Sequence, residues 1–326
     1  MIDPHVHLRD WNESNKMTLE TGLMSAQRSG ISWVFEMPNT KPAITSKALA
    51  LKRIEDADKA IEKNGLLIKH SLYLGLTSNL HQVREVVNTY RELFPRIVGL
   101  KLYCASTTGD LKVGDSYNQY LIFKSLSNLD YSYVVAVHCE DEALFKPNKW
   151  NPQIPSSHNF ARPLKSEYSS IKDTIDNAKL ACFRGNLHIC HVSNPKSIEL
   201  INSARNNLEY KITCGITPHH AIYNTEYMDS LDKNQALMLK VNPPIRNRRI
   251  QEQLFQSILD GKVDFIESDF APHTIEEKIG KPYASGIADF GLHGKLLDEL
   301  KAFGLSSNDI WKLTDYNIVE TFGLGK

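Results

Sequence analysis

Eight short apolar segments recur along the chain, and amphipathic stretches with helical spacing separate most of them. Strand-then-helix repetition predicts a parallel sheet covered by helices, and eight units predict a (β/α)8 TIM barrel forming one domain over 1–326. The expected strands are the initial IDPHVHL and the segments 31–37, 67–76, 97–103, 133–138, 187–192, 210–217 and 263–268. The expected helices are 17–29, 46–63, 79–93, 116–129, 166–184, 196–206 and a closing helix that starts near LSSNDIW, capped by Ser306 and stopped by Gly323.

The charge balance indicates no polyanionic or membrane partner. The chain has 38 Lys and Arg against 38 Asp and Glu, so its formal net charge is zero. It shows neither an apolar run long enough to span a bilayer nor a secretion signal. Its five cysteines form no CxxC pair, and their odd number argues against a full disulfide framework. We therefore expect a reducing cytoplasm.

Six polar residues stand at or beside the ends of the expected strands. Each alone has an ordinary explanation, because a strand-end histidine can be structural, a lysine can reach solvent and an aspartate can cap a helix. A barrel would nevertheless bring all six to one mouth, the end at which barrel active sites lie. The six are His5, His7, Lys101, His138, His191 and Asp269.

This set predicts a centre of two metal ions. Four imidazoles and a carboxylate suit Zn²⁺ or a neighbouring transition metal, and five ligands exceed one tetrahedral site. Burial near metals should lower the pKa of Lys101 and free its amine to capture CO₂. The resulting carbamate could bridge two metals about 3.5–4 Å apart.

With these residues in place, the chain resembles the amidohydrolase superfamily, and within it the dihydroorotases, over nearly its whole length. The order of the motifs makes the resemblance specific, although any one motif alone is weak. They are DPHVHLRD (3–10), MPNT (37–40), GLKLY (99–103), VHCED (137–141), ARPLKSE (161–167), CHVS (190–193), ITPHH (216–220), KVNPPIR (240–246) and SDFAPH (268–273).

The resemblance implies the reversible cyclisation of N-carbamoyl-L-aspartate to L-dihydroorotate in de novo pyrimidine biosynthesis, by a hydroxide that bridges two Zn²⁺ ions. It assigns His5, His7 and Asp269 to one metal and His138 and His191 to the other, with carboxylated Lys101 between them. It also makes Asp269 the general base and then the general acid.

The resemblance also assigns residues to the substrate. Arg9 would grip the ring carboxylate bidentately, Asn39 would donate to the same group, and His273 would complete the clamp. Asn242 and backbone groups near 284–286 would read the imide edge of the ring.

The segment 104–115 resembles the lid of one dihydroorotase branch, in which Thr107 and Thr108 would contact the substrate. KVNPPIR is more similar to another branch. Phe270 departs from the residue that many relatives have after the metal-binding aspartate, and we expect it to reshape the pocket floor. Little sequence is left for the flanking β-sandwich of many superfamily members.

Four further residues are expected to be structural. His219 and His220 carry no pattern that places them at the metals. Cys139 and Cys190 each adjoin a predicted ligand, so strand alternation should point both thiols away from the site.

Three alternative functions remain open, and so does the choice of partner. A hydantoinase or an allantoinase would share the metal ligands, although Arg9 and Asn39 favour a ring that carries a carboxylate. A catalytically silent scaffold for aspartate transcarbamoylase should have lost ligands that this chain keeps. The expected partner is a small-molecule substrate, and a homodimer or association with aspartate transcarbamoylase stays open.

Overall fold

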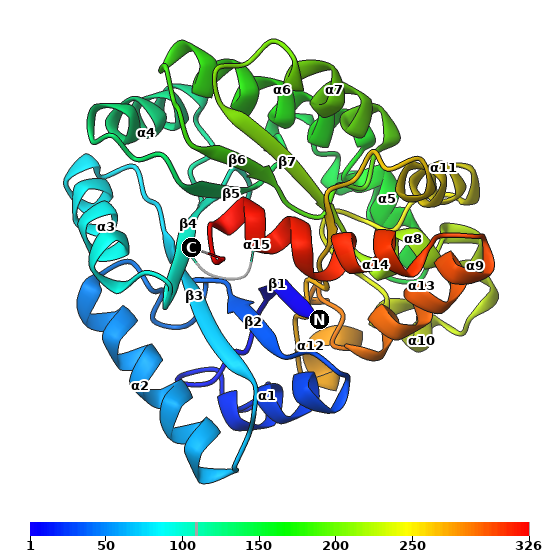
Figure 1. The fold of residues 1–326 in the computed structure, drawn as a ribbon. Helices are drawn as coiled ribbons and strands as arrows, with labels where there is room; N and C mark the ends of the chain where they lie inside the picture. The colour runs from blue at the N-terminus through cyan, green and yellow to red at the C-terminus, as the bar shows by residue number, and fades with distance from the viewer. Residues whose placement is uncertain (108–109, 326) are drawn as a thin grey trace.

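In a computed structural model that describes residues 1–107 and 110–325, eight strands form a barrel surrounded by helices (Figure 1). Neighbouring strands pair in parallel and in chain order, which confirms the predicted barrel. A bridge between Val6 and Phe270 joins the first and last strands, and the His7 amide donates to the Phe270 carbonyl at 2.7 Å. Within the described residues, every strand belongs to this one sheet and none forms a flanking sandwich. The strands are β1 (Ile2–Val6), β2 (Trp33–Glu36), β3 (Lys69–Gly75), β4 (Ile97–Tyr103), β5 (Val134–His138), β6 (Asn186–Ile189), β7 (Lys211–Ile216) and β8 (Phe265–Ile266).

The six expected helices that connect strands are all present. They are α1 (Leu19–Arg28), α2 (Lys47–Lys63), α3 (Leu80–Leu93), α4 (Ser116–Asn128), α6 (Leu164–Leu180) and α7 (Pro195–Arg205). Five of them begin at a side-chain oxygen that accepts a backbone N–H of the first turn, which satisfies a donor that the helix cannot pair internally. These caps are Thr18, Ser46, Asn79, Asp115 and Asn194.

Further helices that the sequence did not predict follow the later strands, and the two longest of them have 12 residues each. Those between β5 and α6 are η1 (Glu142–Leu144), η2 (Pro147–Lys149), η3 (Pro155–Ser157) and α5 (His158–Ala161). Those after β7 are α8 (Pro218–Ile222), α9 (Thr225–Ser230), α10 (Lys233–Met238) and α11 (Arg248–Leu259), and those after β8 are α12 (Ile275–Ile279) and α13 (Gly291–Ala302). No helix in the described ranges has the length and apolar character needed to cross a bilayer.

The closing helix is present in three consecutive parts, α14 (Ser307–Trp311), the π-helical turn η4 (Lys312–Tyr316) and α15 (Asn317–Phe322). Ser306 caps its start, and Gly323 ends it in the left-handed conformation with φ 67°. The red segment in Figure 1 lies across one mouth of the barrel. Its Phe322 ring meets Phe35 edge-on at 5.0 Å and packs with the first residues of several strands, so it closes the N-terminal mouth.

Candidate active site

The polar residues predicted at the strand ends gather at the opposite, C-terminal mouth. His5 lies within β1 and Lys101 within β4, whereas His191 and Asp269 follow β6 and β8. A cavity of about 380 Å³ opens there, and five of the six predicted ligands line it: His5, His7, His138, His191 and Asp269. The sixth, Lys101, lies fully buried beneath the cavity.

His5, His7 and Asp269 form a compact group. Asp269 Oδ1 lies 3.0 Å from His7 Nε2 and 3.3 Å from His5 Nε2. Burial alone would raise the pKa of Asp269, but the hydrogen bond from His7 and the nearby His5 hold that pKa below its usual range. Burial lowers the pKa of His7 to about 4, so this ring is neutral and able to bind a metal.

His138 and His191 form a second group. His138 Nδ1 lies 3.1 Å from His191 Nε2, and the other nitrogen of His138 lies 3.0 Å from Glu140 Oε2. Arg162 in turn pairs with Glu140 and fixes its carboxylate. Burial lowers the pKa of both histidines, so both rings are neutral. A carboxylate that holds one ring nitrogen while the other is available is the common arrangement of metal-binding histidines.

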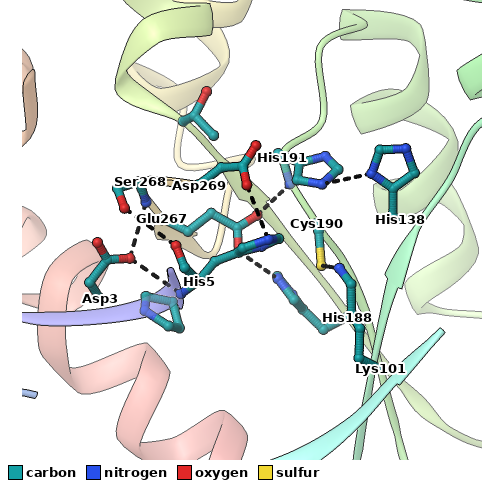
Figure 2. A network of polar contacts seen from close by, with 12 residues as sticks. Asp3, His5, Lys101, His138, His188, Cys190, His191, Glu267, Ser268 and Asp269 are labelled. Carbon is teal, nitrogen blue, oxygen red and sulfur yellow. Dashed lines mark hydrogen bonds and ion pairs between the residues drawn. The ribbon is translucent and has the colours of Figure 1, made fainter. Parts of the chain in front are cut away.

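Lys101 donates to Cys190 Sγ at 3.0 Å and has no carboxylate within ion-pair distance among the described residues (Figure 2). The expectation that the Cys190 thiol points away from the site was wrong. β6 ends at Ile189, and the next residues leave the strand, with φ 38° at His191. Strand alternation therefore no longer applies at Cys190, although the thiol is buried as expected.

The residues present fit a pair of divalent metal ions. One ligand atom from each of His5, His7 and Asp269 lies within 4.8 Å of the others. His191 Nδ1 is buried and has no hydrogen-bond partner in the described part of the chain. Imidazole nitrogens and carboxylate oxygens are among the donors that bind zinc in proteins.

Arg9 lies in the cavity wall, beyond the end of the first strand. β1 ends at Val6, and Arg9 has a φ of 53°. Its Nε donates to the Pro272 carbonyl at 3.0 Å, and its Nη2 lies 3.3 Å from His273 Nε2. Its Nη1 is buried and has no hydrogen-bond partner among the described residues. Arg9 is only 2% exposed, yet it faces the cavity with donor capacity left.

The other predicted substrate residues also line the cavity, with their polar atoms partly engaged. Asn39 Oδ1 lies 2.7 Å from His7 Nδ1, so this side chain orients a predicted metal ligand. His273 lies between Glu277 Oε2 and the Ser285 carbonyl, each at 3.1 Å. Asn242 Oδ1 lies 2.8 Å from His158 Nε2.

The backbone segment 284–286 is only partly available to a ligand. Ala284 and Ser285 line the cavity. The amide of Gly286, in contrast, donates to the Lys240 carbonyl at 2.9 Å, and its carbonyl accepts from Lys278. Gly286 is therefore occupied in holding the loop together.

The expected lid begins at the cavity. Ser106 and Thr107 line it, whereas Thr108 lies outside the described residues. Glu142 of η1 accepts from the Ser106 amide and pairs with Lys112. The two ends of the loop are thus joined by one carboxylate, and lid closure itself stays a prediction.

Phe270 does not reach the pocket floor. It is buried and stacks on Phe290 with ring centroids 3.8 Å apart and an interplanar angle of 2°. The backbone at its neighbour Asp269 has a φ of 48°, so Phe270 does not continue the side-chain alternation of the strand before it. The expectation that Phe270 reshapes the pocket was therefore wrong.

The residues expected to be structural behave as such, apart from Cys190. Cys139 Sγ lies 3.7 Å from Thr174 Oγ1 of α6, on the outer side of the barrel. His220 lies 2.6 Å from Thr217 Oγ1 and 2.9 Å from the Pro243 carbonyl. Neither His219 nor His220 is among the described residues that line the cavity.

Two charged residues near the site were not predicted from the sequence. Lys240 lines the cavity, donates to Ser285 Oγ at 2.6 Å and lies 5.3 Å from the Trp150 ring centre. Burial and the charge of Arg162 lower its pKa to about 7. Glu267 is fully buried between the two groups of histidines. Lys240 is the first residue of the KVNPPIR motif, so the sequence held a signal for it. Glu267, in contrast, is a single acidic residue after a short strand.

No family model matches the chain. The curated dihydroorotase of Bacillus cytotoxicus is 31% identical over 296 residues, which cover 90% of this chain and 64% of that protein. The chain thus spans slightly less than two thirds of the length of this relative. An allantoinase of Escherichia coli is 29% identical over 343 residues, covering 99% of this chain and 71% of the allantoinase.

Solved structures support the same fold. L-hydantoinase (dihydropyrimidinase) from Arthrobacter aurescens superposes with a TM-score of 0.85 at 22% identity, covering 99% of this chain and 70% of the hydantoinase. A dihydroorotase from Saccharomyces cerevisiae gives 0.77 at 17% identity, covering 99% of this chain and 84% of that protein. The chain is therefore similar in sequence to dihydroorotases and allantoinases, and it shares the barrel fold of the hydantoinase and dihydroorotase structures.

Proposed function

We propose that the chain is a dihydroorotase, which interconverts N-carbamoyl-L-aspartate and L-dihydroorotate. The buried guanidinium of Arg9 carries the proposal. It faces the cavity, has an unpaired Nη1, and has no carboxylate within ion-pair distance among the described residues. A carboxylate on the substrate ring would satisfy this group with two charge-assisted hydrogen bonds.

We further propose that the centre holds two Zn²⁺ ions. His5, His7 and Asp269 would hold one, His138 and His191 the other, and carboxylated Lys101 both. Bound zinc would polarise the ring amide and favour ionisation of water. The position of Lys101 supports this role, because the side chain is buried and no carboxylate of the described residues lies within ion-pair distance of its Nζ.

The chain's own residues would then orient the substrate and move a proton. Arg9 would fix the ring carboxylate, and Asn39 would hold His7 in place through its 2.7 Å contact. Asp269 would take a proton from the attacking water and return it to the ring nitrogen. In the biosynthetic direction the same proton moves the other way.

The allantoinase match favours a second candidate, an enzyme that opens a cyclic amide without a ring carboxylate. Steady-state assays with N-carbamoyl-L-aspartate, L-dihydroorotate, allantoin and unsubstituted hydantoin separate the two. We expect turnover of the first two compounds only. Turnover of allantoin or hydantoin without turnover of dihydroorotate would contradict the proposal, and no turnover of any compound by the zinc-loaded protein would favour a scaffold.

A further inference from the structure

One buried carboxylate touches residues of both histidine groups. Glu267 directly follows β8 and is 0% exposed. Its Oε2 lies 3.4 Å from His5 Nδ1, and its Oε1 accepts from the backbone amide of His191 (Figure 2). His5 comes from β1 and His191 follows β6, so Glu267 connects predicted ligands from two strands that are not neighbours in the barrel.

The His5 ring stands between two carboxylates. Asp269 Oδ1 lies 3.3 Å from its Nε2, and Glu267 Oε2 lies 3.4 Å from its Nδ1. If Nε2 binds a metal, Nδ1 carries the proton and faces Glu267. In the structure these two atoms lie at ion-pair distance without a hydrogen bond, whereas a metal-bound histidine usually donates its second nitrogen to a carboxylate, which fixes the tautomer and the ring orientation.

The surrounding residues are shaped to hold this carboxylate. A Cβ built on Gly215 of β7 would lie 2.4 Å from Glu267 Oε1, closer than side chains approach one another. The missing side chain therefore leaves the space that the carboxylate occupies. On its other side, His188 Nε2 lies 3.3 Å from Oε2, and the His188 ring is itself stacked on Phe265 at 4.5 Å.

We propose that Glu267 is a positioning residue of the metal centre, which orients His5 and fixes the backbone turn at His191. The inference rests on the metal centre in the proposed function. It assigns to Gly215 the role of leaving room for Glu267. Glu267 acts through the histidines, so its loss should weaken metal binding before it changes the fold.

The test is Zn²⁺ affinity, measured by chelator competition on metal-stripped protein without substrate. Glu267→Gln keeps the size of the side chain and removes its charge, and we expect zinc to bind about 10–100-fold more weakly. Asp264→Asn is the matched control. Asp264 precedes the same strand, accepts from the Cys214 amide at 2.7 Å and pairs with Arg205, at the far end of the barrel. The Asp264→Asn variant should keep the wild-type zinc affinity.

Gly215→Ala provides an independent test that leaves every charge in place. We expect Gly215→Ala to displace the Glu267 carboxylate and to weaken zinc binding. In a Glu267→Ala background the same substitution should cause no further loss of zinc affinity, because the two positions act on one contact. If Glu267→Gln does not fold, the zinc affinity of folded Gly215→Ala decides the question, and a wild-type value would overturn the inference.

The inference would be overturned if folded Glu267→Gln bound zinc with wild-type affinity. It would also be overturned if Gly215→Ala caused the same loss of zinc affinity with and without Glu267. Wild-type protein that binds no zinc would overturn both this inference and the proposed metal centre. Wild-type protein that binds zinc but does not turn over dihydroorotate would overturn the proposed function alone.

Discussion

The two mouths of the barrel are built from the same eight strands, but they differ in chemistry. At the N-terminal mouth, aromatic rings fill the interior, with Phe322 placed edge-on against Phe35 and Tyr73. At the C-terminal mouth, imidazoles and buried carboxylates surround a cavity, and Lys101 lies buried nearby. Burying so many polar groups is costly, whereas burying aromatic surface stabilises the fold.

The backbone of the C-terminal mouth has an unusual conformation at three residues of the site, although Asp130 and Cys182, in the loops before β5 and β6, have positive φ as well. Arg9, His191 and Asp269 all have positive φ, and all three belong to the C-terminal mouth. Such conformations are unfavourable for residues other than glycine and tend to cluster at functional sites. We infer that the apolar mouth supplies stability and the polar mouth supplies chemistry, so substitutions at the two ends should change different measured quantities.

The largest effect is expected from Lys101→Ala at the polar mouth. It removes the residue between the two histidine groups, so metal content and turnover of dihydroorotate should be lost together. Metal analysis and an activity assay of the folded variant check this. Short carboxylic acids added with zinc should restore part of both, and a variant with full metal content and normal activity would contradict the role of Lys101.

Arg9→Lys should lower kcat/KM for dihydroorotate while both metals stay bound. Lysine keeps the charge but loses the bidentate fork, and disrupting a buried charged contact costs on the order of 2–5 kcal/mol. The exposed Arg28→Lys is the control. Normal turnover by Arg9→Lys would remove the main support for a substrate with a ring carboxylate.

Phe322→Ala tests the apolar mouth. Removing a buried aromatic side chain should lower the free energy of unfolding by about 3–5 kcal/mol, with zinc affinity unchanged. Chemical denaturation and chelator competition measure the two quantities. Phe303→Ala, at a position that is 70% exposed, should change neither of them. A loss of zinc affinity in Phe322→Ala without a loss of stability would break the division between the mouths.

The sequence predicted the strands, six connecting helices and the positions of the six polar residues, because hydrophobic periodicity and strand ends are local signals, but it missed α11 and α13. The predicted side-chain positions were wrong for some residues that follow the last residue of a strand. At Cys190 strand alternation was extended past the strand end, where the positive φ at His191 redirects the chain, and Phe270 was placed at the pocket floor only because it follows Asp269. Glu267 could not be found, because its partners come from β1 and β6 and meet only in the closed barrel.

A smaller effect is expected from Thr107→Val in the loop that follows β4. Thr107 lines the cavity, and loss of one hydrogen bond to the substrate should raise the barrier by about 1 kcal/mol. The measurement is kcat at saturating dihydroorotate, with zinc content as the control. An unchanged kcat would return this part of the loop to an ordinary surface connection.

The smallest effect concerns pH. Burial lowers the pKa of Lys240 to about 7, below the usual value of 10.5. Between these pH values the unfolded chain holds a proton that the folded chain has lost, so the free energy of unfolding should rise with pH from about 7 to about 10. Lys240→Met should flatten this rise, and Lys281→Met, at an exposed position, should not. An equal slope in both variants would contradict the burial effect.

The central claim is that the polar mouth holds two metal ions bridged by a modified lysine. Anomalous diffraction at the zinc edge from crystals of the active, zinc-loaded protein tests it most directly. We predict two peaks about 3.5–4 Å apart, one beside His5, His7 and Asp269 and one beside His138 and His191, with Lys101 extended by a carboxylate that reaches both. Active protein with a single peak, or with unmodified lysine density at Lys101, would contradict this account.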